Sequence, residues 1–143
     1  MIKKFELDLS SKITAWGMEL FRIRALISFG DVKKGDLGGY VEKEDNLSHS
    51  GDAWVSGDAW VSGDAAVSGD AKVSKLNDYI VFKNNWSSGR YFTYTRSNKM
   101  WRVGCFYGTG EELVEKAYQD SENSGKHYEA YVNLVKTLEK LEK

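Results

Sequence analysis

Residues 49–74 read HSGDAWVSGDAWVSGDAAVSGDAKVS, and the six-residue phrase GDA-x-VS occurs in them four times without a gap. In a frame that starts at Val55, each unit has an apolar residue first and a small residue fifth, and this frame extends back to Leu37 and fades after Val73. Such a period is typical of a parallel β-helix, because each unit supplies one short strand and a Gly-Asp corner. The repeat therefore predicts a scaffold and contains no reactive pattern.

The spacing resembles the hexapeptide-repeat family, whose left-handed β-helix has three units in each coil. On that model residues eighteen apart stack, with Leu37, Val55 and Val73 in one column and His49 and Val67 in another. We therefore expect a mainly β fold in which residues 37–78 form a short left-handed parallel β-helix. An N-terminal β cap over residues 1–36 and a C-terminal α+β module over residues 79–143, with a β-hairpin and a two-helix tail, are expected to flank it, since so few units bury too little surface to stand alone.

The flanking sequences carry strand and helix patterns. Residues 18–27, MELFRIRALI, alternate so that one face takes Phe21, Ile23, Ala25 and Ile27 and the other takes Arg22 and Arg24. Residues 78–108 predict three strands with breaks at KNNWSSG and SNK. Thr109 and Glu112 form a capping-box pattern that opens a helix to about Gln119, residues 120–125 are expected to form a loop, and apolar residues then recur at helical spacing to the C-terminus.

Composition excludes several classes of protein. Lys and Arg total 20 against 21 Asp and Glu, so a general nucleic-acid binder is not expected. Cys105 is the single cysteine, which rules out an internal disulfide framework and favours a reducing compartment. No run approaches membrane-spanning length. These features predict a soluble cytoplasmic protein that binds no membrane.

A second resemblance covers nearly the whole chain. The phrases FRIRALISFGDVKKGDLGGYVEKEDNLS and CFYGTGEELVEK, on either side of the GDA units, are similar to a family of small hexapeptide-repeat proteins encoded by bacteriophages and prophages. The more specific part is FGDVKKGDLGGYVEKE, residues 29–44. The resemblance implies a β-helical architecture and a bacterial host cell as the setting.

Few residues suggest reaction chemistry. Many hexapeptide-repeat proteins are acyltransferases in which a histidine beside the coil acts as the base, and His49 is the candidate within the coil. It falls on an inward position of the repeat, however, which favours a structural role. The Asp row at positions 52, 58, 64 and 70 is expected to close the corners through hydrogen bonds to the backbone. We predict no catalytic residue, no metal site and no cofactor.

Residues 86–107 contain no acidic residue and interleave aromatic side chains with cations. Arginine matches the geometry of phosphate and aromatic rings stack on bases, so this segment predicts a surface for a small anionic, planar ligand. The alternative is that the rings form the core beneath the final helix. The candidate ligand-binding residues are Arg22, Arg24, Arg90, Tyr91, Tyr94, Arg96, Lys99, Trp101 and Arg102.

Trp54 and Trp60 occupy outward positions of the repeat, and exposed indoles require a cover. They predict either an oligomer interface or packing beneath the terminal segments. The hexapeptide-repeat resemblance implies a homotrimer, or a multiple of one.

Three functions remain open. The first is a non-enzymatic sponge through which a phage sequesters a nucleotide immune signal, such as a cyclic nucleotide or a cyclic ADP-ribose type molecule. The second is a structural oligomer that binds a host or virion protein through its aromatic tail. The third is an acyltransferase that uses His49. The basic aromatic segment favours the first.

Overall fold

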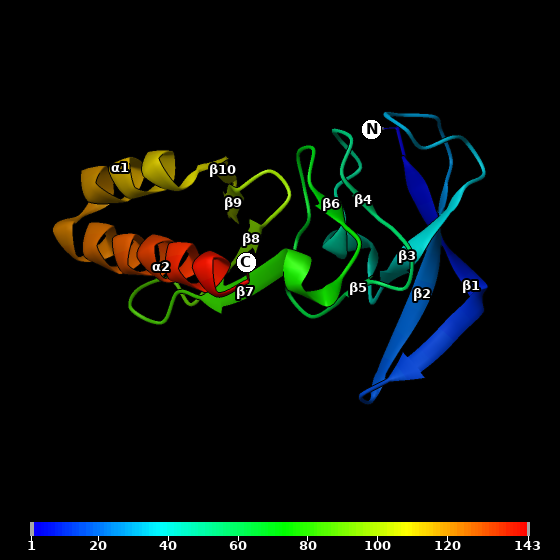
Figure 1. Ribbon diagram of the computed structural model, residues 1–143, viewed down its shortest axis with the longest axis horizontal. Coiled ribbons are helices and arrows are strands. Elements are labelled where there is room, and N and C mark those ends of the chain that lie inside the picture. The colour runs from blue at the N-terminus through cyan, green and yellow to red at the C-terminus, as the bar shows by residue number, and fades with distance from the viewer. Residues whose placement is uncertain (1, 143) are drawn as a thin grey trace.

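The computed structural model describes residues 2–142 of the chain (Figure 1). A mixed sheet has the strand order β1-β2-β3-β5, an antiparallel sheet has the order β10-β9-β8-β7, and β4 pairs with β6. Figure 1 shows the β1–β2 hairpin at one end of the molecule, the repeat in the middle and the two helices at the other end. The elements are β1 Phe5–Ala15, β2 Met18–Ala25, β3 Leu37–Val41, β4 Trp54–Val55, β5 Trp60–Val61, β6 Lys72–Val73, β7 Tyr79–Lys83, β8 Tyr91–Thr95, β9 Met100–Val103, β10 Phe106–Thr109, α1 Gly110–Asp120 and α2 Glu122–Leu141, with 3₁₀ turns at Glu44–Asn46 and Leu76–Asp78.

The predicted fold class is wrong. The protein is a mixed α+β structure with several small sheets rather than a left-handed parallel β-helix with caps. The parallel strands β4, β5 and β6 are two residues long each, and β3 joins β5 in a sheet that continues antiparallel into the N-terminal hairpin. A six-residue period specifies which side chains turn inward, but it does not specify how far the parallel pairing extends.

Inward burial of alanine and valine is the main effect of the repeat. All four repeat alanines and all four repeat valines are buried: Ala53, Ala59, Ala65, Ala71, Val55, Val61, Val67 and Val73. Val55 pairs in parallel with Val73, eighteen residues on, as predicted. Val41 instead pairs with Val61 and Leu47 with Val67, both twenty residues apart, while Leu37 is exposed. The predicted columns that contain Leu37 and His49 are therefore wrong, because eight residues rather than six separate the inward Leu47 from the inward Val55, which shifts the frame.

Each corner of the repeat closes through its backbone. The Ala59 N–H donates to the carbonyl of Ser56 at 3.3 Å, and the next two units repeat this bond. The intervening glycine takes a left-handed conformation, with φ of 62° at Gly57, which favours glycine over other residues. Among residues 2–142, no hydrogen bond joins an aspartate side chain of the row to the backbone at its own corner, so the predicted role of these carboxylates is wrong. Two of them lie within ion-pair distance of a cation instead, Asp64 at 3.6 Å from Lys43 and Asp58 at 4.0 Å from Arg22.

The residue at the outward position of each repeat unit differs according to the segment that packs over that unit. Trp54 is buried and packs edge-on against Phe29, with ring centroids 5.3 Å apart, so the N-terminal segment covers it. Trp60 is half-buried, and its carbonyl accepts a hydrogen bond from Tyr79 at 3.1 Å. Ala66 lies beneath the C-terminal sheet, where its N–H donates to Thr93 at 3.1 Å. Of the two predicted interface tryptophans, Trp54 is unavailable to another chain.

The N-terminal segment and the repeat share one hydrophobic core. Phe5 and Ile23 pack with the repeat valines in a single cluster. A Cβ at Gly39 would lie 2.6 Å from the Ala59 carbonyl oxygen and 2.7 Å from a methyl group of Val55, so glycine permits β3 to approach the repeat backbone. The predicted boundary between residues 36 and 37 accordingly separates strands of one sheet.

The C-terminal sheet has two different faces. Phe92, Tyr94 and Trp101 are buried in a second core with α1 and α2. Thr93 lies on the opposite face and contacts the repeat. The sequence prediction of three strands missed the break at Gly104, where β9 turns into β10 with a φ of 56°.

The helical tail follows the predicted cap but not the predicted loop. The Glu112 N–H donates to the Thr109 hydroxyl at 3.2 Å and the Thr109 N–H donates to the Glu112 carboxylate at 2.9 Å, which confirms the capping box. Residues 122–125, however, belong to α2, whose N-cap is Ser121. Gly125 allows this turn to pack directly on the Tyr118 ring. No helix within residues 2–142 is long and apolar enough to cross a membrane.

We expect Gly39→Ala to lower the free energy of unfolding by roughly 2–3 kcal/mol, because the new methyl group forces backbone atoms of two strands apart. The matched control is Gly63→Ala, whose Cβ would meet nothing within 4 Å and which should cost only about 1 kcal/mol of left-handed backbone strain. Urea denaturation of both variants measures the difference. Equal losses would show that close approach at Gly39 does not limit the pairing of β3 with β5.

Candidate functional site

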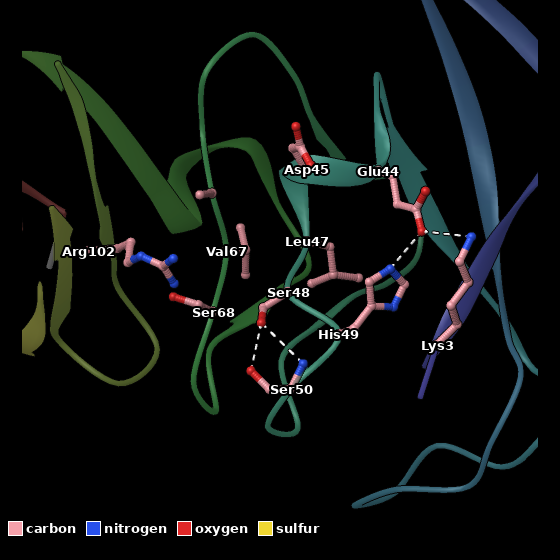
Figure 2. A pocket seen from close by; sticks show the side chains of 11 residues that line it. Lys3, Glu44, Asp45, Leu47, Ser48, His49, Ser50, Val67, Ser68 and Arg102 are labelled. Carbon is pink, nitrogen blue, oxygen red and sulfur yellow. Dashed lines mark hydrogen bonds and ion pairs between the residues drawn. The ribbon is translucent and has the colours of Figure 1, made fainter. Parts of the chain in front are cut away.

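A cleft of about 410 Å³ lies where the N-terminal strand, the repeat and the C-terminal sheet meet (Figure 2). Lys3 comes from the segment before β1, Arg102 comes from β9, and the remaining lining residues come from the repeat. They are Glu44, Asp45, Leu47, Ser48, His49, Ser50, Ala66, Val67 and Ser68. We call this site the three-segment cleft.

His49 holds one wall of the three-segment cleft in place. Its Nδ1 accepts a hydrogen bond from the Lys4 backbone N–H at 3.0 Å, so the neutral ring carries its proton on Nε2 and donates to Glu44 at 2.7 Å. The ring stacks on Phe5 with centroids 4.3 Å apart. Both nitrogens are therefore engaged, and a role as the base of an acyltransferase would require His49 to give up the bond that anchors the N-terminal strand.

Glu44 connects His49 to the cation on the same wall. The Lys3 ammonium lies 3.4 Å from its carboxylate, as Figure 2 shows. The hydrogen bond from His49 is the main cause of a lowered pKa of Glu44, with a smaller contribution from Lys3. The carboxylate thus stays ionised and neutralises Lys3 locally.

Lys4 is a buried cation beneath this wall. Its ammonium donates to the carbonyl of Ala53 at 2.6 Å and to that of Gly51 at 3.3 Å, and it lies 4.8 Å from the centroid of the Phe29 ring. Burial is the main cause that lowers the pKa of Lys4 to about 8, and the nearby charge of Lys72 lowers it further. The N-terminal strand is therefore fixed to the repeat by both its backbone and its side chain.

Arg102 and Ser68 form the opposite wall. The Arg102 Nε donates to the Gly104 carbonyl at 2.6 Å, and no carboxylate of the described residues lies within ion-pair distance of this guanidinium. Ser68 is 4% exposed as a residue, and its hydroxyl is a buried polar atom without a hydrogen-bond partner in the described structure. Figure 2 shows both side chains at the same end of the cleft. A buried hydroxyl without a partner is unfavourable by about 1–3 kcal/mol, which a bound acceptor or donor would relieve.

Tyr107 fixes the position of this wall. Its hydroxyl accepts a hydrogen bond from Asn98 at 2.8 Å and donates to the Ser68 carbonyl at 3.3 Å. Tyr107 is the cross-strand partner of Arg102. Gly69 permits this contact, because any Cβ there would collide with the Tyr107 ring. The C-terminal sheet thereby holds Arg102 beside Ser68.

Two of the predicted ligand-binding residues lie on the N-terminal sheet. Arg22 donates to the Tyr40 hydroxyl at 2.9 Å and its guanidinium lies over the Tyr40 ring. Arg24 donates to Asp8 at 2.9 Å and lies 3.7 Å from Glu6. Neither lines the three-segment cleft.

Four more predicted ligand-binding residues are either buried in the C-terminal core or paired with a glutamate near the C-terminus. Tyr94 and Trp101 are buried under the helices, which is the alternative that the sequence left open, so the predicted stacking surface is wrong for both rings. Arg96 lies 3.7 Å from Glu142, and Lys99 lies 3.1 Å from Glu139. Two glutamates near the C-terminus, Glu139 and Glu142, thus pair with cations that the local sequence leaves unbalanced.

Apart from Arg102, which lines the cleft, the other two predicted ligand-binding residues are Arg90 and Tyr91, and both are exposed. Arg90 lies against Gly104 and lines a separate cleft on the helical side, together with Lys116 and Asp120. The Tyr91 ring has the Lys83 ammonium above it at 5.8 Å. Of the nine predicted residues, only Arg102 lines the three-segment cleft.

Sequence reasoning missed the serines of the cleft. Ser48 accepts a hydrogen bond from the Ser50 N–H at 3.2 Å, and the two hydroxyls lie 3.0 Å apart. Ser68 is one of four equivalent repeat serines, and nothing in its own unit distinguishes it except Ala66 in place of tryptophan. That small residue is the one signal that another element packs closely there.

No group of three or more His, Cys, Asp or Glu side chains within residues 2–142 is arranged to hold a metal ion. Comparison with protein-family models finds no match, and no curated protein sequence matches the chain. The chemistry of the three-segment cleft is therefore the basis for a functional assignment.

We expect the free energy of unfolding to rise by about 2 kcal/mol between pH 7.5 and pH 9.5 because of Lys4. The unfolded lysine keeps its proton up to about pH 10.5, whereas the folded one loses it near pH 8, so the unfolded state binds more protons in this window. Lys4→Met should abolish the rise, and Lys3→Met, which removes the neighbouring exposed ammonium, should retain it. Urea denaturation across this pH range tests the expectation, and a flat wild-type profile would contradict it.

Proposed function

We propose that the protein is a non-enzymatic binding protein that sequesters a small phosphate-bearing nucleotide signal in the three-segment cleft. The observation that carries this proposal is the pairing of an unpartnered, buried Ser68 hydroxyl with the Arg102 guanidinium, which has no carboxylate partner in the described part of the chain. A buried polar group without a partner is uncommon in folded proteins and calls for an explanation such as a ligand.

The chemistry at this end of the cleft suits a phosphate. The terminal nitrogens of Arg102 can donate two parallel hydrogen bonds to phosphate oxygens. The Ser68 hydroxyl adds a third donor on the same wall. Leu47 and Val67 provide apolar lining, which lowers the local dielectric and strengthens these bonds.

The other charges in the cleft limit the ligand further. Lys3 and Glu44 neutralise each other, which leaves Arg102 and the Asp45 carboxylate as the opposite charges that face the cleft. A ligand with one phosphate and free hydroxyls fits this pair, because hydroxyls can donate to Asp45 and to the serines. No Trp, Tyr or Phe lines the cleft, so the ribose phosphate would bind inside and the base would stay at the opening.

Sequestration, rather than turnover, follows from the side chains present. His49 is held by two hydrogen bonds, and the cleft offers no cysteine nucleophile. A protein that binds an immune nucleotide without converting it would act as an anti-defence sponge for a phage, the setting implied by the resemblance of residues 29–44. The phage origin and the signalling role are part of the proposal.

We expect Ser68→Ala to weaken ligand binding at least tenfold while it raises the free energy of unfolding by about 1 kcal/mol, because it removes a buried hydroxyl without a partner. Arg102→Ala should weaken binding by at least a hundredfold. Titration calorimetry with ribose 5-phosphate, adenosine monophosphate and a panel of cyclic nucleotides measures the affinities. Arg96→Ala is the matched control, since that arginine is on the same sheet but is paired with Glu142.

Binding that Arg96→Ala abolishes and Arg102→Ala leaves unchanged would overturn the assignment of the site. Failure of every phosphate compound to bind would overturn the proposed function.

A further inference from the structure

The β1–β2 hairpin extends well beyond the sheet that anchors it. Its outer half, residues 12–21, which we call the arm, points away from the repeat in Figure 1. The arm carries exposed apolar side chains, Trp16 at 88% and Ile13 at 38% exposure. The proposed cleft makes no use of this region.

Trp16 is unfavourable for the fold in two ways. It lies in the two-residue turn between Ala15 and Met18 with a φ of 54°, and Gly17 follows with a φ of 78°. Positive φ at both positions defines a type I′ turn, for which asparagine followed by glycine is the preferred pair. A bulky residue in the left-handed region is strained, and its ring is in water. Neither local conformation nor burial explains a tryptophan here, and such outliers point to a contact outside the fold.

β1 also has a free edge. It is the terminal strand of its sheet, and no described strand pairs with its outer side. The register of β1 with β2 shifts between Asp8 and Lys12, and Asp8 binds the N–H and the hydroxyl of Ser10 within this bulge, at 3.1 Å and 2.6 Å. Leu9 is 70% exposed as a result. A bulged edge resists open-ended addition of strands, so a partner must match it specifically.

We infer that this surface binds a second copy of the chain through side chains, with the two β1 strands antiparallel about a two-fold axis at Leu9; the backbone groups of Glu6 face β2 and take no part in the contact. In this register Glu6 of each chain faces Lys12 of the other, and the two Leu9 side chains meet. Ile2, which is 75% exposed, faces Trp16 of the other chain. The three most exposed apolar residues of the N-terminal region and its one pair of complementary charges thus come together under a single symmetry operation.

The contact is isologous, so it closes after two chains and leaves no unsatisfied copy of the same surface. Glu6 and Lys12 each have a local ion-pair partner, Arg24 at 3.7 Å and Glu19 at 3.5 Å. All four groups are substantially exposed, so these local pairs exchange readily for pairs across the interface.

The test measures the mass of the full chain by light scattering after size-exclusion chromatography, over a range of concentrations. The wild type should show a concentration-dependent shift from 16.2 kDa to twice that mass. Trp16→Asn should raise the dissociation constant at least tenfold without lowering the melting temperature of the dilute, monomeric protein, because asparagine suits the turn. The control is Leu134→Asn. Leu134 is also an exposed apolar residue, but it lies on α2, so this variant should leave the dissociation constant unchanged.

Charge reversal tests the register. Glu6→Lys and Lys12→Glu should each weaken self-association, and an equimolar mixture of the two variants should restore a dimer. A wild-type chain that stays monomeric at every concentration, or an assembly that Trp16→Asn leaves intact, would overturn the inference. A trimer that is indifferent to these substitutions would also overturn it and would support the oligomer implied by the hexapeptide-repeat resemblance.

Discussion

Burial of one alanine and one valine in each repeat unit is the constraint on which the other contacts depend. These small and branched side chains bring neighbouring backbones close enough for the parallel pairs at Val55–Val73 and Val41–Val61. They also provide the apolar surface on which Phe5 and Ile23 complete the first core. Without that surface the N-terminal hairpin would have no partner for its inner face, and the β3 glycines would have no backbone to approach.

The three-segment cleft is a consequence of how the two cores are joined. The C-terminal sheet buries its aromatic face under the helices and turns its hydroxyl-bearing face, with Thr93 and Tyr107, to the repeat. Hydrogen bonds at this junction are directional and sparse, so the sheet covers the repeat incompletely. Arg102 and Ser68 lie where the cover ends, and the segment held by His49 closes the far side.

Local features could be predicted from the sequence, and long-range ones could not. The capping box at Thr109 and the inward alanines and valines depend on residues a few positions apart. The prediction of the fold class was wrong because two extra residues between Leu47 and Val55 change the pairing offset, and because a period alone carries no information on strand length. The structure does not bring the nine predicted ligand-binding residues together on one surface, and Glu139 and Glu142, some forty residues downstream, lie within ion-pair distance of Lys99 and Arg96. The net charge of a short segment of sequence does not show which helix will pack over that segment.

The outward residues of the repeat have a consequence for how such a chain can change in length. Trp54 requires the N-terminal cover, and Ala66 requires the close approach of Thr93, so each unit is specific to its place. Insertion or deletion of a whole GDA-x-VS unit would keep the inward pattern but move a tryptophan or an alanine beneath the wrong neighbour. The neighbouring segments therefore constrain the number of repeat units in this protein. Variation among related chains should appear as substitutions at the outward position rather than as added or lost units.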